Sequence, residues 1–218
     1  LVESLPEFVH PKHFSYSNSP KIEIAIGLES SNSVVLDKSV NKRLRWPHFV
    51  KVCETAHENG AEVKAYVLLK PPYLGERDAI EDAVQSATDA APYVDKISIN
   101  PVNVQKNTVV EKLWFRNEWI APWLWSVVEV LERCKDLPAK VYSDPTGGGT
   151  RRGAHNCNDC NGKILEALKE HRLGNGNLKG LECECKPRWK VLKHQSSYRR
   201  NGAEPHGYRR GFGNGRRF

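Results

Sequence analysis

The four cysteines between residues 157 and 185 are the side chains whose spacing most directly indicates chemistry. They form two short pairs, Cys157-x2-Cys160 and Cys183-x-Cys185, separated by 22 residues. Each close pair supplies half of a tetrahedral site, and thiolate ligands favour zinc or iron–sulfur clusters. We interpret the set as a metal site holding zinc in a structural role, in which His155 could replace one ligand. The alternative is a group of unrelated reduced thiols.

A second candidate is the carboxylate of Glu29, which ends the stretch from Ile22 to Ser30. Side chains alternate along a strand, which leaves the isoleucines on one face and Gly27 and Glu29 on the other. A small and acidic face, with a glycine near the terminal carboxylate, indicates an interior that holds a ligand. The alternative is an amphipathic edge strand with solvated glutamates.

Both candidates need elements that position them, and the apolar pattern predicts four strands, over 22–29, 62–70, 94–100 and 140–143. One helical pattern lies in each interval, which is typical of βα units with parallel strands. Four such units make half a barrel, so the predicted class is α/β, a partial, half TIM-like βα barrel. Chemistry in such folds collects at the C-terminal ends of the strands. Those ends carry Glu29, Lys70, the segment from Asn100 to Gln105, and Asp144.

The C-terminal end of the chain is basic. From residue 186 onward there are ten Lys or Arg against one acid, which leaves 23 basic and 25 acidic residues before it. Basic pairs alternate there with glycine and aromatic residues, a pattern suited to phosphate contacts and base stacking on RNA. The arginines are Arg199, Arg200, Arg209, Arg210, Arg216 and Arg217. A solvated tail without function is the alternative.

These observations divide the chain into four expected segments. They are a connecting segment over 1–21, the βα barrel over 22–150, a Cys-rich metal-binding element over 151–187 and a disordered basic Gly/Arg-rich tail over 188–218. No run approaches the ~18 apolar residues of a membrane span, so we expect a cytoplasmic protein without a membrane partner. The chain opens on Leu1 and contains no methionine. We therefore expect residues to be missing upstream.

Five short stretches carry a resemblance to a known family. They read Ile-Gly-Leu-Glu-Ser, Lys-Ser-Val-Asn-Lys, Tyr-Val-Leu-Leu-Lys-Pro-Pro, Ile-Ser-Ile-Asn-Pro-Val-Asn-Val-Gln and His-Asn-Cys-Asn-Asp-Cys. In this order they resemble the C-terminal two thirds of the radical SAM subunit of archaeosine synthase (RaSEA), within the Elp3-related radical SAM family. The likeness covers roughly residues 20 to 185. It identifies 22–150 as the C-terminal part of a radical SAM βα barrel.

The resemblance implies two cofactors, S-adenosylmethionine (SAM) and a [4Fe-4S] cluster that reduces it to a 5′-deoxyadenosyl radical. It also implies two partners, tRNA and the alpha subunit of archaeosine synthase. In this family the radical cleaves a lysine adduct on a 7-deazaguanine base of tRNA to give archaeosine. Glu29 matches a strand-end carboxylate that contacts SAM, an acceptor suited to ammonium or ribose hydroxyls. Asn100, Asn103 and Gln105 match the Asn-Pro-x-Asn-x-Gln segment of the family and are assigned to cofactor or substrate.

One departure leaves three functional interpretations open. The cluster motif Cys-x3-Cys-x2-Cys does not occur in the 218 residues. The first interpretation is a fragment of a radical SAM lyase, inactive alone, whose cluster ligands lie outside this chain; no catalytic residue is assigned. The second is a non-catalytic zinc- and RNA-binding module. The third is another Elp3-like radical SAM enzyme that modifies tRNA.

Overall fold

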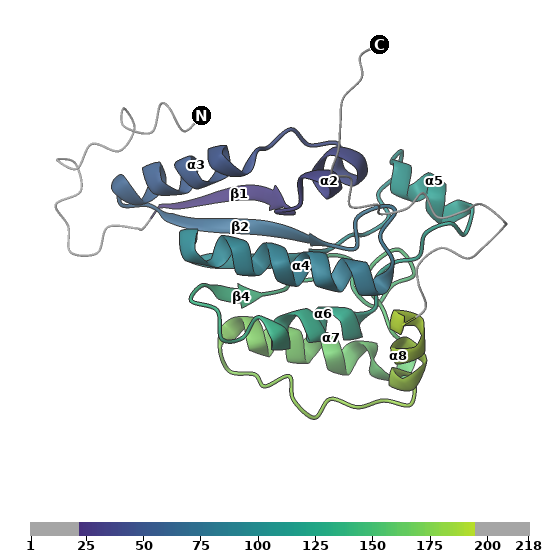
Figure 1. Ribbon diagram of the computed structural model, residues 1–218. Helices are drawn as coiled ribbons and strands as arrows, with labels where there is room; N and C mark the ends of the chain where they lie inside the picture. Colours follow the sequence, from purple (N-terminus) through teal and green to yellow (C-terminus); the bar gives the residue numbers. More distant parts are fainter. Residues whose placement is uncertain (1–21, 195–218) are drawn as a thin grey trace, which may run out of the picture.

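The computed structural model describes residues 22–194 and contains a four-stranded parallel sheet in the order β1-β2-β3-β4 (Figure 1). The strands are β1 (Glu23–Glu29), β2 (Glu62–Leu69), β3 (Lys96–Pro101) and β4 (Lys140–Tyr142). Each of the four predicted strands is confirmed to within two residues. The sheet order follows the chain order because every crossover carries a helix, as parallel neighbours require. The predicted α/β class, a partial βα barrel, is confirmed.

The helices of the βα units also lie where the apolar pattern placed them. They are α3 (Trp46–Glu58), α4 (Glu76–Ala90), α6 (Leu124–Arg133) and α7 (Asn158–Leu173). Pro47 stands in the first turn of α3, where its missing N–H costs nothing. The remaining elements are short and were not predicted: α2 (Ser33–Val35), η2 (Leu36–Val40), η3 (Ala91–Tyr93), α5 (Val109–Phe115) and α8 (Lys186–His194).

The two faces of the sheet differ in chemistry. The face that packs against the helices is made of apolar side chains such as Val63, Ile97 and Ile99, each 0% exposed. Burying one such isoleucine contributes about 1.5–3 kcal/mol. The opposite face carries polar and aromatic residues, among them Tyr66 and Ser98, and lines a cavity. This division is the one that the period-2 pattern predicted.

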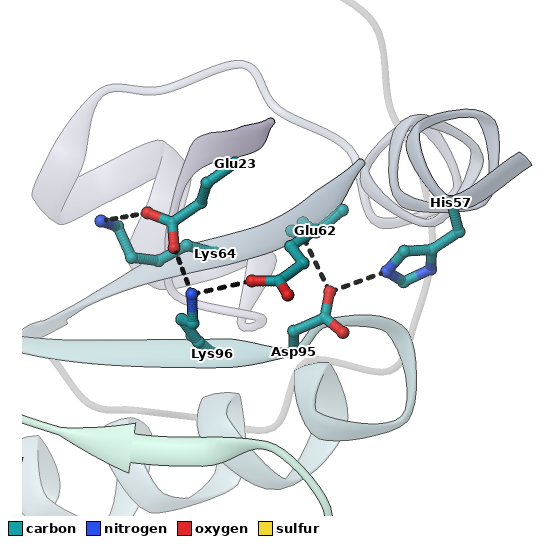
Figure 2. Close-up of polar contacts among 7 residues, drawn as sticks. Glu23, His57, Glu62, Lys64, Asp95 and Lys96 are labelled. Atoms are coloured by element: carbon teal, nitrogen blue, oxygen red, sulfur yellow. Dashed lines mark hydrogen bonds and ion pairs between the residues drawn. The ribbon is translucent and has the colours of Figure 1, made fainter. Parts of the chain in front are cut away.

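Matched charges fill the polar face at the N-terminal ends of the strands (Figure 2). Lys96 Nζ lies 2.7 Å from Glu23 Oε2 and 2.9 Å from Glu62 Oε2, and Lys64 Nζ lies 2.7 Å from Glu23 Oε1. The hydrogen bonds from Lys64 and then Lys96 lower the pKa of Glu23. These residues cover the polar face at the N-terminal ends of the strands, and their opposite charges form ion pairs with one another.

Two features differ from expectation. Lys70, expected among the strand ends where chemistry collects, instead turns into the interior: it is 4% exposed and its Nζ lies 2.5 Å from Glu76 Oε2. Residues 186–194 form α8, so the start of the expected tail at 188 falls inside a helix. Trp189 of α8 is 4% exposed and donates from Nε1 to Ser126 Oγ over 2.8 Å. Ser126 in turn donates to Glu76, which connects α8 and α6 to the buried lysine.

Within the described residues, no helix has the length and apolar content that crossing a membrane requires.

Candidate functional site

A cavity of about 950 Å³ opens on the polar face of the sheet, toward the C-terminal ends of the strands. Strands β2, β3 and β4 contribute Tyr66, Ser98 and Tyr142, and the segment 38–41 closes one side. A volume of this size suits a small organic ligand or cofactor. The cavity therefore lies where the half-barrel interpretation places the chemistry.

The three amides singled out in the sequence converge in this cavity. Asn100 Oδ1 accepts a hydrogen bond of 2.8 Å from Ser98 Oγ. Gln105 Nε2 donates to Asn103 Oδ1 over 2.7 Å, and Asn103 Nδ2 donates to the backbone oxygen of Thr146 over 3.1 Å. Among the described residues, Asn100 Nδ2 and Gln105 Oε1 have no hydrogen-bond partner. One donor and one acceptor thus remain for a ligand.

The structure places Glu29 beside this cavity but not in its lining. The β1–β2 register shifts between Gly27 and Glu29, and Glu29 has φ of 66°. Its carboxylate lies 3.0 Å from Lys42 Nζ, which also donates to the backbone oxygen of Gly27. A Cβ on Gly27 would lie 2.6 Å from Lys42 Nζ, so the glycine makes room for this ion pair. The Glu29 side chain is 20% exposed and does not point into bulk solvent.

Several cavity residues were missed in the sequence. Tyr66 and Ser98 share a strand face with residues already assigned, so period-2 alternation could have identified them. Lys38 had no period-2 signal, because it lies in the π-helix η2, but it opens the Lys-Ser-Val-Asn-Lys stretch of the resemblance. Among the described residues Lys38 forms no ion pair, whereas Arg172 is paired with Asp144 at 2.6 Å. Lys38 therefore offers the cavity an uncompensated positive charge.

The four cysteines of the two pairs form one compact group. Cys157 Sγ lies 3.6 Å from Cys160 Sγ and 3.5 Å from Cys183 Sγ, while Cys160 Sγ lies 3.7 Å from Cys185 Sγ. All four sulfurs lie within 4.8 Å of one another. Sulfurs bound tetrahedrally at ~2.3 Å from zinc lie about 3.8 Å apart, so the donor set fits a zinc ion. His155 is outside the group, and its Nδ1 lies 2.9 Å from the backbone oxygen of Gly153.

The surroundings of the thiolate group suit a bound metal. Cys157 is the N-cap residue of α7 and Cys160 lies in its first turn, so the start of one helix holds both sulfurs. Burial raises the pKa of the Cys160 thiol to about 12, so a bound metal would have to displace its proton. Trp125 Nε1 donates to Cys185 Sγ over 3.3 Å, a contact that orients a ligand from outside the group. The backbone N–H of Trp125 also donates to Asn156 Oδ1 over 3.2 Å. Through Trp125, helix α6 is thereby hydrogen-bonded to Cys185 of the second cysteine pair and to Asn156, which precedes Cys157 of the first pair.

The six arginines assigned to nucleic-acid binding (Arg199, Arg200, Arg209, Arg210, Arg216 and Arg217) lie outside the described residues.

Comparison with known proteins identifies relatives over most of the chain. The chain is 42% identical over 202 residues to archaeosine synthase subunit beta of Methanosarcina acetivorans, covering 88% of the chain and 58% of the relative. It is 44% identical over 196 residues to archaeosine synthase subunit beta of Thermococcus kodakarensis, again covering 88% and 58%. An uncharacterized protein of Methanocaldococcus jannaschii is 33% identical over 197 residues. The chain thus spans somewhat over half the length of the curated relatives that it matches.

A solved structure supports the fold. Elp3 of Methanocaldococcus infernus, with its N-terminus deleted, matches with a TM-score of 0.51 over 75% of this chain and 38% of that one. The sequences are 16% identical, so this likeness concerns the fold alone. No protein-family model matches the chain.

Proposed function

Since the chain is a homologue of archaeosine synthase subunit beta, we propose that it is the cofactor-binding part of a radical SAM enzyme that modifies tRNA. The observation that carries this proposal is the polar face of the sheet. Asn100, Asn103 and Gln105 converge there in one cavity at the C-terminal ends of the strands. A polar strand face that surrounds a cavity, backed by an apolar face against helices, is the arrangement of a cofactor-binding βα barrel.

The proposed cofactors are SAM and a [4Fe-4S] cluster, whose ligands would lie outside these 218 residues. The chemistry that this pair supplies is reductive cleavage of SAM to a 5′-deoxyadenosyl radical. In this proposal Asn100 donates from Nδ2 and Gln105 accepts at Oε1, while Asn103 holds Gln105 in position. The Glu29 carboxylate, steadied by Lys42, accepts hydrogen bonds from the cofactor at the rim.

The thiolate group would hold zinc in a structural role. It joins the start of α7 to the segment that precedes α8, and α8 in turn packs on α6 through Trp189. A metal bound only by the folded form stabilises that form. The zinc is thus proposed to fix the elements behind the cavity rather than to take part in the reaction.

The proposed reaction is cleavage of a lysine adduct on a 7-deazaguanine base of tRNA to give archaeosine. The partners would be tRNA and an alpha subunit that makes the adduct. The test uses the complete, anaerobically reduced protein with SAM and tRNA that carries the adduct. We expect 5′-deoxyadenosine and archaeosine in equal amounts, measured by mass spectrometry of the small molecules and of digested tRNA. Absence of 5′-deoxyadenosine would refute the radical mechanism.

A second candidate is a non-catalytic zinc- and RNA-binding module. It is favoured by one observation: these 218 residues hold all four thiolates of a metal site but no Cys-x3-Cys-x2-Cys motif. Iron analysis of the complete protein separates the two candidates, because only the enzyme carries about four irons per chain beside the zinc. A different modified base in the tRNA digest would instead indicate another Elp3-like tRNA-modifying enzyme.

A further inference from the structure

A second concave site, distinct from the cofactor cavity, lies between α5 and α8. It is a groove of about 430 Å³ whose walls come from the end of α5, the segment 117–123, the loop 151–156 and α8. Figure 1 shows α5 and α8 at the end of the molecule toward which the arrowheads of β1 and β2 point. We call this site the aromatic groove. Neither the metal group nor the proposed cofactor contacts account for it.

Large aromatic side chains dominate one wall of the aromatic groove. Trp114, Phe115, Trp119 and Trp123 all line it, and Phe115 is 67% exposed. Trp114 is held in place, because the Arg152 guanidinium lies 5.2 Å from its ring and also pairs with Glu111 on the same helix. Phe115 thus offers an exposed ring beside the fixed, half-buried ring of Trp114. Aromatic rings at a surface are the platforms on which unpaired bases stack.

The opposite wall is basic. Arg151 and Arg188 line the groove and are exposed, and among the described residues neither forms an ion pair. None of the described residues that line the groove is acidic. Arginines without a carboxylate partner beside aromatic rings suit a ligand with both phosphates and flat rings.

Helix α5 connects the aromatic groove to the cofactor cavity. Its first residues, Val109 and Val110, line the cavity, whereas its last residues, Trp114 and Phe115, line or border the groove. Seven helical residues span about 10 Å. An RNA segment bound in the groove would therefore lie within a few nucleotides of a base bound in the cavity.

We propose that the aromatic groove binds an unpaired stretch of the tRNA substrate, with bases on Trp114 and Phe115 and phosphates on Arg151 and Arg188. This proposal rests on the proposed function, because it takes the substrate of the cavity to be tRNA. It assigns part of the RNA affinity to residues 22–194.

Fluorescence anisotropy with the complete protein tests this, using an unmodified tRNA transcript and a twelve-nucleotide oligouridylate as probes. Replacing both arginines (R151Q/R188Q) should weaken binding of either probe at least tenfold and lower the slope of log affinity against log salt by about 2. Phe115→Ala should weaken binding roughly fivefold or more through lost stacking. A twelve-base-pair RNA duplex should compete poorly.

The matched control removes two charges elsewhere. Lys51 and Lys135 are exposed and line neither the groove nor the cavity, so K51Q/K135Q should bind tRNA with nearly unchanged affinity. Thermal unfolding midpoints within 2 °C of the parent, roughly a few tenths of a kcal/mol, establish that each variant is folded.

Three outcomes contradict the proposal in distinguishable ways. Equal tRNA affinity of R151Q/R188Q and K51Q/K135Q would overturn the groove assignment and leave the proposed function standing. Loss of alpha-subunit binding with unchanged tRNA affinity would identify the groove as a protein-docking surface instead. A complete protein that binds neither probe would overturn both the groove assignment and the role in tRNA modification.

Discussion

Buried polar residues whose partners lie on other elements hold the ends of the strands in place. Lys70 follows β2 with φ of 63° and turns into the interior, where Glu76 neutralises it. Glu76 also accepts from the backbone N–H of Trp123 over 2.9 Å and from Ser126. A buried lysine is tolerated only with such partners. The polar ends of the strands are thus fixed by a network that involves α4, α6 and, through Trp189, α8.

Replacing Lys70 with methionine should leave the Glu76 carboxylate buried without its cation. We expect the free energy of unfolding to fall by about 3 kcal/mol, the usual cost of removing one partner of a buried pair. Chemical denaturation measures this. Lys51→Met, which alters an exposed lysine, is the control and should change stability by less than about 0.5 kcal/mol. An equal effect of the two substitutions would contradict the role assigned to Lys70.

Asp82 makes stability depend on pH. Burial raises its pKa to about 6, opposed by the hydrogen bond from Ser30, and its Oδ2 has no partner among the described residues. The folded chain therefore prefers the protonated carboxyl. Its stabilising contribution is complete below about pH 4, where the unfolded carboxyl is also protonated, and is lost as the pH rises through 6.

Asp82→Asn, which keeps a neutral side chain at every pH, tests this. We expect it to exceed the parent in stability at pH 7.5 by on the order of 2–3 kcal/mol, and the difference to disappear below pH 4. Denaturant titrations at four pH values between 4 and 7.5 measure the trend. Asp136→Asn, at an exposed position, should show no such trend. A constant difference across the range would rule out the raised pKa.

The residues assigned from the sequence fall into two groups. Some are identified by one short segment of sequence, and others have positions that only the complete fold determines. Asn100, Asn103 and Gln105 were assigned because they match the Asn-Pro-x-Asn-x-Gln segment of the family that the chain resembles, and this segment follows a predicted strand end. Glu29 was expected inside the cavity, but the register shift at the end of β1 moved it to the rim, and nothing in the alternation predicts such a shift. Lys70 was identified only as a strand end. Its burial was not predicted, because its partner Glu76 lies on the following helix and only the fold brings that carboxylate inward.

At the scale of elements, a strong apolar periodicity was sufficient to predict a helix or strand from the sequence, and a weak periodicity was not. The strands and the four long helices carry repeated apolar residues, so their types and positions followed from the pattern. Helix α8 buries mainly Trp189 among basic residues, which in the sequence resembles a solvated tail. Helix α5 packs with Val104 and Trp119 in a separate small cluster, and loop-like residues surround it. The aromatic groove between these two helices was therefore invisible in the sequence.

Removing the metal should act on these same elements. We expect one zinc per chain at the thiolate group, measured by elemental analysis of protein purified without added metal. The double variant C157S/C160S should lose that zinc and unfold at a lower temperature, because α7 and the segment before α8 lose their link. C53S, at a buried cysteine outside the group, is the control and should keep the zinc. Neither zinc nor iron in the parent would end the proposal of a metal site.

At the scale of the whole molecule, the two faces of one sheet have different roles. The apolar face and four helices form the core, while the polar face stays open between a charged layer at the strand starts and an amide-lined cavity at the strand ends. The chain spans 58% of the archaeosine synthase beta subunits that it matches. The proposed activity accordingly belongs to the complete protein, to which this region would contribute the proposed cofactor-binding surface.

Binding of SAM to that surface is the most direct test of the account. Equilibrium dialysis of the complete, anaerobic protein with radiolabelled SAM should show that Asn100→Leu weakens binding about tenfold, as expected for a lost hydrogen bond and an intruding apolar side chain. Asn175→Leu, at an exposed position after α7, should bind SAM like the parent. If Asn100→Leu binds SAM with the affinity of the parent, the polar face of the sheet is not the cofactor site.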